Sequence, residues 1–562
     1  MELIIDGRKI EALTGQRLKE LVDVLNLDSD KLSERPIAAK IAGEVYTLNY
    51  VPVREDQRIR RAMSASGGSV NLLHYNDPAG KDVYERTAYF VLFLAIERLW
   101  PNARTNMTAS LGPGVYVEVR QASDFSVQRL KEEMQKIVKE DMLIVRRRVP
   151  TKDALAYFQD HGNTDKANLL KWWPEETFDE YVCGDYHDHY FGEMAPSTGY
   201  VTVWDIRPEE DGCGFVFLLP DDQNPDKVGT YQHMPHFFSV FTEGERWCEL
   251  MECETVADLN QYVKSNNVRK LIRVNEALHE KRFSQIADMI SQQECKVVML
   301  AGPSSSGKTT SANRLATQLQ VHGKLPILMS LDDYYVDRSL LTPGPDGPYD
   351  FEHINTIDTE LFREHIGALI RGEEVEIPGF DFKTGNRVWH GHMLQLQKNS
   401  VIIVEGLHAL NPVLRPDGVG EGAIFKLYVS PLIPLGMDHH TRIPTNFLRL
   451  LRRIVRDYKT RGATVQRTLS MWDSVRQGEK RWIYPFQESA DVIFNSSTLY
   501  ELAILKRYIF DLLSEVTPDD SWYEEVLRIK KMLSFIQAAD VDDEIPPTSL
   551  VREFIGGNAF YR

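Results

Sequence analysis

A short phosphate-binding pattern constrains the fold of this chain more than any other feature. The segment Gly302-Pro-Ser-Ser-Ser-Gly307-Lys308-Thr309 has the G-x-x-x-x-G-K-[ST] spacing and directly follows the apolar run Lys296–Ala301. This motif needs a strand before it and a helix after it, because the N–H groups of the loop curl around phosphate oxygens at the helix N-terminus. The sequence therefore predicts an α/β domain that binds a nucleotide.

The residues of this loop have separate expected roles. Gly302 and Gly307 permit the close turn, Lys308 can reach the outer phosphates, and the Thr309 hydroxyl suits Mg²⁺ as a ligand. The expected phosphate-binding set is Gly302, Ser304, Ser305, Ser306, Gly307, Lys308, Thr309 and Thr310.

Two acidic residues follow predicted strands at the same edge of the sheet. Asp332 comes after Ile327–Leu331, and Glu405 comes after Val401–Val404. Ligands of open α/β sheets bind beyond the carboxyl ends of the strands, so both acids are expected to face the phosphates. Asp332 can accept the proton of a substrate hydroxyl or hold Mg²⁺, although it could instead cap a helix. Glu405 stands at the strand end where a Walker-B acid, which assists Mg²⁺, would be found.

A basic segment follows further along the chain. Arg449, Arg452, Arg453 and Arg456 recur at steps of three and four residues, which places them along one helix face. Planar guanidinium groups suit the charge that spreads over a transferring phosphoryl group. The alternatives are a solvated helix face or salt bridges to acidic neighbours.

The remaining patterns predict five regions. Further strands of the P-loop domain are expected at Val297–Ala301, Ile424–Val429 and Val492–Phe494, which with the intervening helices indicate a parallel sheet covered on both faces. At the N-terminus the pattern predicts a pair of strands, a helix and then further strands, which is the element order of a β-grasp fold. The alternative interpretation of this region is an unspecialised α+β cap. The expected regions are a β-grasp module (1–62), an α+β region with strands that include Val201–Asp205 (63–255), a helical connector (256–293), the P-loop domain (294–515) and a C-terminal helix with a tail (516–562).

Taken together, six motifs in the P-loop domain resemble the uridine kinase/phosphoribulokinase family. They are Gly302–Thr309, Asp332-Asp333-Tyr334-Tyr335, Phe351-Glu352-His353, Pro378-Gly-Phe-Asp-Phe382, Glu405-Gly406 and Arg452-Arg453-Ile-Val-Arg456-Asp457. The resemblance implies an ATP-dependent kinase of a small hydroxyl compound, usually a nucleoside, with ATP and Mg²⁺ as cofactors.

The same resemblance implies roles for individual residues. Asp332 would be the base and Glu352 would bind ribose hydroxyls, while Thr309 and Glu405 would serve Mg²⁺. Lys308 and the lid arginines Arg453, Arg456 and Arg461 would stabilise charge, and Tyr335, Phe380 and Phe382 would complete the substrate site.

This chain departs from that family at the positions that read a pyrimidine. Phe380 stands where uridine–cytidine kinases carry a Tyr, a His expected near Gly385 is missing, and the lid ends Arg461-Gly462-Ala463 instead of Arg-Gly-Arg. Loss of hydrogen-bonding partners can cost ~10⁴-fold in discrimination. The acceptor expected from the family resemblance is thus a nucleoside, and the alternative acceptor is a different sugar or a sugar phosphate.

The N-terminal half resembles the TGS module and the accessory domain of threonyl-tRNA synthetases. Cys183-x-x-x-His187 keeps one of the two ligand pairs of the editing site, but Glu85–Tyr89 lacks the histidines of the other. Metal binding by Cys183, His187 and His189 is not expected, because three ligands within seven residues close a tetrahedral site poorly. The competing function is an RNA-binding regulatory protein whose P-loop domain acts as a nucleotide switch. Asp332, Glu405 and the arginine helix favour the enzyme, because a switch has no need for a hydroxyl-binding acid such as Glu352.

The net charge and the hydropathy limit the binding partners and the cellular location that can be expected. The net charge is −17, from 82 acidic and 65 basic residues, which argues against broad nonspecific nucleic-acid binding. Ala88–Ile96 is the most apolar segment and is far shorter than the ~20 residues of a membrane span. With no export signal at the N-terminus, the expected location is the cytoplasm, without membrane contact. A homo-oligomer is compatible with the sequence.

Overall fold

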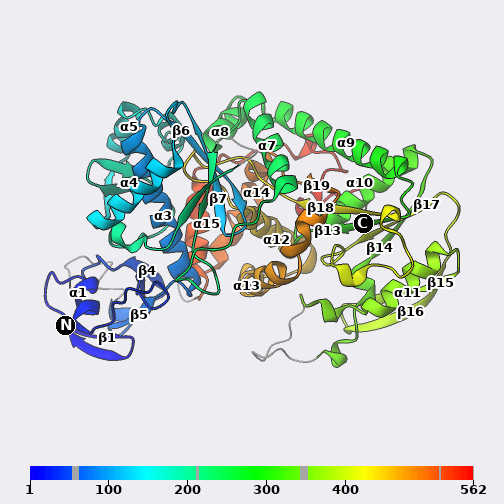
Figure 1. The fold of residues 1–562 in the computed structure, drawn as a ribbon, viewed down its shortest axis with the longest axis horizontal. Helices are drawn as coiled ribbons and strands as arrows, with labels where there is room; N and C mark the ends of the chain where they lie inside the picture. The colour runs from blue at the N-terminus through cyan, green and yellow to red at the C-terminus, as the bar shows by residue number, and fades with distance from the viewer. Residues whose placement is uncertain (54–62, 210–213, 342–351, 518–519, 561–562) are drawn as a thin grey trace.

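The computed structural model describes residues 1–53, 63–209, 214–341, 352–517 and 520–560. In Figure 1 the N-terminal half lies at the left and the P-loop domain lies at the right. The long helix α9 (Val268–Gln292) runs along the top of the view toward the P-loop domain. Among the described residues, no helix is both long enough and apolar enough to cross a membrane.

The P-loop domain is built on a five-stranded parallel sheet in the order β14-β17-β13-β18-β19. Alternate residues of the central strand enter different cores: Val297 and Met299 face one, while Val298 and Leu300 face the other. This explains why its sequence is continuously apolar. The predicted strands are confirmed as β13 (Val297–Ala301), β14 (Leu325–Ser330), β17 (Ser400–Glu405), β18 (Ile424–Ser430) and β19 (Val492–Asn495).

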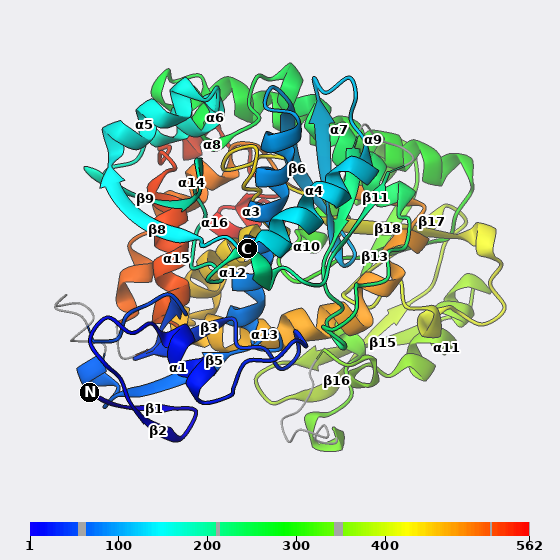
Figure 2. The same ribbon diagram turned by 60° about the vertical axis from the view of Figure 1, so that its left-hand side comes forward.

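Helices and one hairpin surround this sheet (Figures 1 and 2). The hairpin joins β15 (Val375–Asp381) to β16 (Asn386–Leu394). The helices are α10 (Lys308–Val321), α11 (Thr359–Ile370), α12 (Thr445–Arg461), α13 (Val465–Trp482), α14 (Glu501–Ile509) and the short α16 (Arg552–Ile555). The helix α15 (Tyr523–Ser534) lies instead beside the N-terminal half, where Glu524 accepts from the Val45 N–H at 3.0 Å.

The N-terminal sheet has the expected strands and one more. The sheet order is β2-β1-β5-β3-β4, so β5 lies between β1 and β3. The predicted module ended at residue 62, but β5 follows that boundary, so the sheet is larger than the predicted module. Pairing between strands so distant in sequence leaves no local pattern that could have predicted it. The elements are β1 (Glu2–Ile5), β2 (Arg8–Glu11), α1 (Leu18–Val24), β3 (Ala38–Ile41), β4 (Glu44–Thr47) and β5 (Ser69–Leu73).

The next region is mixed α/β, with two antiparallel sheets of order β10-β9-β8 and β11-β12-β7-β6. A strand expected at Val201–Asp205 begins only at Asp205. The elements are α3 (Pro78–Leu99), β6 (Arg104–Leu111), β7 (Gly114–Arg120), α4 (Val127–Glu140), β8 (Val145–Pro150), α5 (Thr151–Asp160), α6 (Thr164–Leu170), β9 (Thr177–Cys183), β10 (Tyr186–Asp188), β11 (Asp205–Pro208), β12 (Gly214–Leu218) and α7 (Pro235–Leu250).

The connector is two helices, α8 (Val256–Lys264) and α9, separated at Asn266, whose φ of 58° is left-handed. The two halves of the chain share a core, in which Phe158 and Phe178 of the N-terminal half join Leu448 and Leu451 of α12. A buried charge cluster also crosses this boundary: Lys166 of α6 pairs with Asp188 and with Asp438, the latter at 3.4 Å.

Candidate phosphate-transfer site

The phosphate loop leaves β13 and enters α10 in the geometry that the motif predicts. Ser305 and Gly307 both have left-handed φ angles, of 59° and 90°, which turn successive N–H groups toward one side. Such a nest binds anions. Gly302 is required by space, because a Cβ there would lie 2.1 Å from the Val429 carbonyl oxygen. Lys308 Nζ donates to the Pro303 carbonyl at 3.1 Å and so folds over the loop.

The two predicted acids meet beside this loop. Asp332 lies in a short 3-10 turn after β14, and the cap of that turn is Ser330, whose Oγ accepts from the Asp332 N–H at 3.2 Å. Asp332 is therefore not the capping residue. Glu405 ends β17, the neighbouring strand. Gly406 lets the two strand ends approach, since a Cβ there would lie 2.6 Å from Leu331 Cβ.

The electrostatics couple these groups. Burial raises the pKa of Glu405 to about 7, against the opposing pull of Lys308. Burial also raises the pKa of Asp332, opposed by Lys308, a hydrogen bond with Tyr335 and the charge of Arg461. Burial lowers the pKa of Lys308, while Glu405 and Asp332 favour its charged form. The positive charges of a loop lysine and of an arginine in α12 thus both act on the Asp332 carboxyl group.

Oxygen donors beside the loop fit a magnesium ion. Thr309 Oγ1 donates to Glu405 Oε1 at 3.4 Å, and the Ser330 hydroxyl lies 3.5 Å from the same oxygen. Hydroxyl and carboxylate oxygens are the ligand type that Mg²⁺ prefers. A bound cation would also favour the ionised carboxylate of Glu405, which burial disfavours.

Two of the arginines in α12 are structural, which corrects the expectation of a single arginine face directed at phosphate. Arg449 is buried against Glu479 of α13, and its Nε donates to the Ser304 carbonyl at 2.9 Å. Arg452 forms a buried bidentate pair with Glu501 at 2.8 and 3.0 Å. The sequence spacing cannot distinguish buried structural arginines such as Arg449 and Arg452 from lid arginines, because both kinds lie along one side of α12.

The three predicted lid arginines share a different set of contacts. Arg453 Nη1 donates to Ser304 Oγ at 2.7 Å and so touches the phosphate loop. Arg456 donates to Asp457 at 2.8 and 2.9 Å, and Arg461 lies 3.5 Å from the same carboxylate. Arg453 Nε lies 3.4 Å from Asp457 as well, so one buried aspartate pairs with all three arginines.

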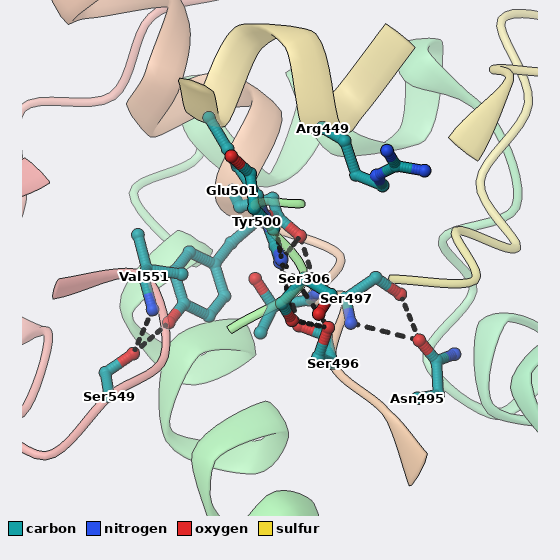
Figure 3. Close-up of polar contacts among 12 residues, drawn as sticks. Ser306, Arg449, Asn495, Ser496, Ser497, Tyr500, Glu501, Ser549 and Val551 are labelled. Carbon is teal, nitrogen blue, oxygen red and sulfur yellow. Dashed lines mark hydrogen bonds and ion pairs between the residues drawn. The ribbon is translucent and has the colours of Figure 1, made fainter. Parts of the chain in front are cut away.

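A second polar layer supports the loop from behind (Figure 3). Ser496 Oγ donates to the Ser306 carbonyl at 2.5 Å, and Arg452 donates to the Ser496 carbonyl at 2.8 Å. Ser497 donates to Asn495 through both its N–H and its hydroxyl. The residues after β19 therefore hold the phosphate loop in place.

The predicted acceptor residues gather at the β15–β16 hairpin. The rings of Tyr335, Phe380 and Phe382 contact one another edge to face, with centroids 5.2 to 6.2 Å apart, and the Phe382 side chain is 56% exposed. Glu352 packs on α13, where a Cβ at Gly478 would lie 2.3 Å from Glu352 Cβ. Phe351 lies outside the described residues.

Gly385 is a turn glycine of this hairpin, and its geometry explains why no histidine stands there. Its φ is 74°, and a Cβ would lie 2.5 Å from Arg338 Cδ. The Gly385 carbonyl accepts from the Arg338 N–H at 2.9 Å.

Three residues of the site were not predicted. The Glu479 carboxylate accepts from the Ser304 N–H at 2.8 Å, and Gly478 makes room for Glu352. Glu553 of α16 accepts from the Thr310 hydroxyl at 2.7 Å. No signal in the sequence distinguishes these residues from ordinary helix residues, because their partners lie far away along the chain.

The residues that resemble part of an editing motif, Cys183, His187 and His189, make separate contacts. His187 Nδ1 lies 3.2 Å from Glu180, and His189 Nδ1 lies 2.7 Å from the Asp179 carbonyl. Burial raises the pKa of the Cys183 thiol to about 11. Within the described parts of the chain, no three His, Cys, Asp or Glu side chains are grouped to hold a metal ion.

Comparison with known proteins separates the two halves of the chain. The model of the "Phosphoribulokinase / Uridine kinase family" matches residues 297–503. A uridine kinase of Staphylococcus haemolyticus is 30% identical over 210 residues, which are 37% of this chain and 91% of that protein. The chain belongs to the phosphoribulokinase/uridine kinase family.

The N-terminal region is similar to another class of protein. A threonine–tRNA ligase of Acetivibrio thermocellus is 30% identical over 205 residues, 36% of this chain and 30% of that protein. The chain thus spans less than a third of the ligase. Among solved structures, a putative fructose transport system kinase from Silicibacter matches 38% of the present chain at 18% sequence identity, with a TM-score of 0.28. A possible uridine kinase from Bacillus stearothermophilus matches 38% at 20% identity, with a TM-score of 0.26.

Proposed function

We propose that this protein transfers the γ-phosphoryl group of ATP to a sugar hydroxyl of a nucleoside. One observation carries the proposal: Asp332 and Glu405 follow the ends of the neighbouring strands β14 and β17 beside the phosphate loop, where the positive charges of Lys308 and Arg461 act on Asp332. A carboxylate near these cations can take the proton of an acceptor hydroxyl while they balance the charge on the phosphoryl group.

The other residues have supporting roles in this reaction. Arg453, on Ser304, lies where charge would develop, and Arg456 and Arg461 adjoin it through Asp457. Thr309 and Glu405 would hold Mg²⁺, which neutralises phosphate charge when bound.

The acceptor side favours a flat ring system. Three aromatic side chains, Tyr335, Phe380 and Phe382, offer faces and edges that stack on a base, and Glu352 can accept hydrogen bonds from sugar hydroxyls. Since Phe380 has no hydroxyl and Gly385 no side chain, we expect loose discrimination among bases.

RNA binding by the N-terminal half is a second candidate function, supported by the similarity to a threonine–tRNA ligase. Its strongest basic run is already engaged, however: Arg146 lies 2.7 Å and Arg148 lies 2.8 Å from Asp179. A cytoplasmic location and a homo-oligomeric state stay predictions.

A panel of acceptors tests the proposal. The full-length protein is given ATP and Mg²⁺ with nucleosides, free sugars and sugar phosphates, and ADP release is measured, with Lys308→Ala as the control. Turnover with nucleosides that is lost in the variant supports the proposal. Turnover with sugar phosphates alone would change the acceptor class, and no turnover together with tight tRNA binding would refute the kinase reaction.

A further inference from the structure

The C-terminal segment Ser549–Phe560 returns to the P-loop domain and packs on the phosphate loop. Two of its apolar side chains, Leu550 and Phe554, are fully buried. Ser549 Oγ donates to Glu276 Oε1 at 2.7 Å, and it lies 3.4 Å from the Tyr500 hydroxyl (Figure 3). The segment is thus anchored to α9 and to the residues that support the loop from behind.

The anchored segment places a carboxylate on the first turn of α10. Glu553 Oε2 accepts from the Thr310 hydroxyl at 2.7 Å and from the Thr310 N–H at 3.3 Å. Asn558 Nδ2 also donates to the Thr310 hydroxyl, at 3.2 Å, and Thr310 is fully buried. Leu550 covers Gly307 closely, since a Cβ there would lie 3.1 Å from Leu550 Cδ2.

This carboxylate adds negative charge to the site where nucleotide phosphates would bind. It favours the charged form of Lys308 and the protonated form of Glu405, so its field reaches both groups. The first N–H groups of a helix are its anion-binding groups, and an anion there is stabilised by the helix dipole. A carboxylate and a phosphate group cannot use the Thr310 N–H at the same time.

We propose that Glu553 is an internal competitor of the nucleotide, so that its carboxylate must leave Thr310 before phosphate binds there. The proposal rests on the nucleotide-binding function proposed above. In the free protein the helix N-terminus is satisfied by the chain's own carboxylate, and part of the nucleotide's binding energy is used to displace it. Loss of the two Thr310 contacts then loosens α16.

The affinity for ADP tests this competition. Glu553→Gln removes the charge and keeps a hydrogen-bond acceptor, while Glu553→Ala removes both. ADP titrated calorimetrically into the full-length protein should bind each variant about tenfold more tightly than the wild type, the scale of a carboxylate at a helix N-terminus. Asp543→Asn is the matched control, because Asp543 carries the same charge and lies shortly before this segment but pairs with Arg269. It should leave the ADP affinity unchanged.

A second measurement uses the unmodified protein. Hydrogen exchange at residues 550–556 should become faster when ADP binds. Slower exchange there would show that the segment closes over the nucleotide, which would overturn the proposal. ADP binding by the wild type with no tighter binding by either Glu553 variant would overturn the competition alone. ADP binding by none of the proteins would refute the nucleotide-binding function, and the competition with it.

Discussion

At the scale of single residues, Asp332 carries the chemistry of the proposed reaction. Its carboxyl group follows β14 directly and is under the positive charge of both Lys308 and Arg461. We predict that Asp332→Asn retains ATP binding but lowers turnover by about 10²–10⁴, because the amide cannot take the hydroxyl proton. Steady-state rates and calorimetric ATP binding separate the two effects.

Asp333→Asn is the matched control for this prediction. Burial and the charge of Asp332 raise the pKa of its carboxyl group to about 6, and Lys308 is not among the groups that shift this pKa. We expect a much smaller loss of turnover. Near wild-type turnover in Asp332→Asn would exclude Asp332 as the base.

The sequence was sufficient to find Asp332, Glu405 and the phosphate loop, because their positions depend on local spacing at strand ends. It could not show that Arg449 and Arg452 are buried structural residues, since burial depends on α13 and α14 packing against α12. Glu479 was not found for the same reason: its partner Ser304 lies 175 residues away.

At the scale of elements, one buried histidine joins α9 to the residues after β19. His279 Nε2 lies 3.1 Å from the Ser497 carbonyl, and its ring contacts Phe494. Burial lowers the pKa of His279 to about 3, helped by the charge of Arg314. In the unfolded chain this histidine titrates at its ordinary value of 6.5, so the unfolded state binds the proton first.

The stability of the protein should therefore fall as pH drops from about 6.5 toward 3. The slope from this residue is at most about 1.4 kcal/mol per pH unit. His279→Gln keeps an N–H donor and removes the titration, so chemical denaturation of this variant should show a slope shallower by that amount. The exposed His322→Gln is the control. Equal slopes in His279→Gln and the wild type would contradict the prediction.

Elements were predicted well where their partners were near in sequence. The P-loop domain strands are short apolar runs between helices, so their pattern identified them within two residues. The N-terminal sheet was predicted without β5, because β5 pairs in parallel with β1 across more than sixty intervening positions. The connector was predicted only as helical, and the pattern did not show that Asn266 divides it into two helices with a left-handed turn.

At the scale of the whole molecule, the two halves are joined by buried charge as well as by a shared core. Lys166 is 3% exposed and lies between Asp188 and Asp438, which belong to different halves. We predict that Lys166→Ala lowers the free energy of unfolding by about 3–5 kcal/mol, because two buried carboxylates lose their counter-charge. Hydrogen exchange during urea unfolding should show the loss in both halves.

Lys171→Ala is the control, since Lys171 is exposed and its Nζ contacts Asn168. Its effect should stay within about 0.5 kcal/mol. An effect of Lys166→Ala confined to the N-terminal half would contradict the coupling. No local pattern could have predicted this contact, because Asp438 lies 272 residues from Lys166.

The helix α9 is long, so a small tilt of this helix would produce a large displacement at its far end. Its 25 residues span about 37 Å, at ~1.5 Å for each residue. Along that length Glu276 holds Ser549, and Glu276 and Glu280 both hold Arg314 of the helix that follows the phosphate loop. A tilt of about 5° at one end would carry the other end by about 3 Å, as follows from that length. A rotation this small at the end near α8 would move the other end of α9, which leads into β13, by about the length of a hydrogen bond.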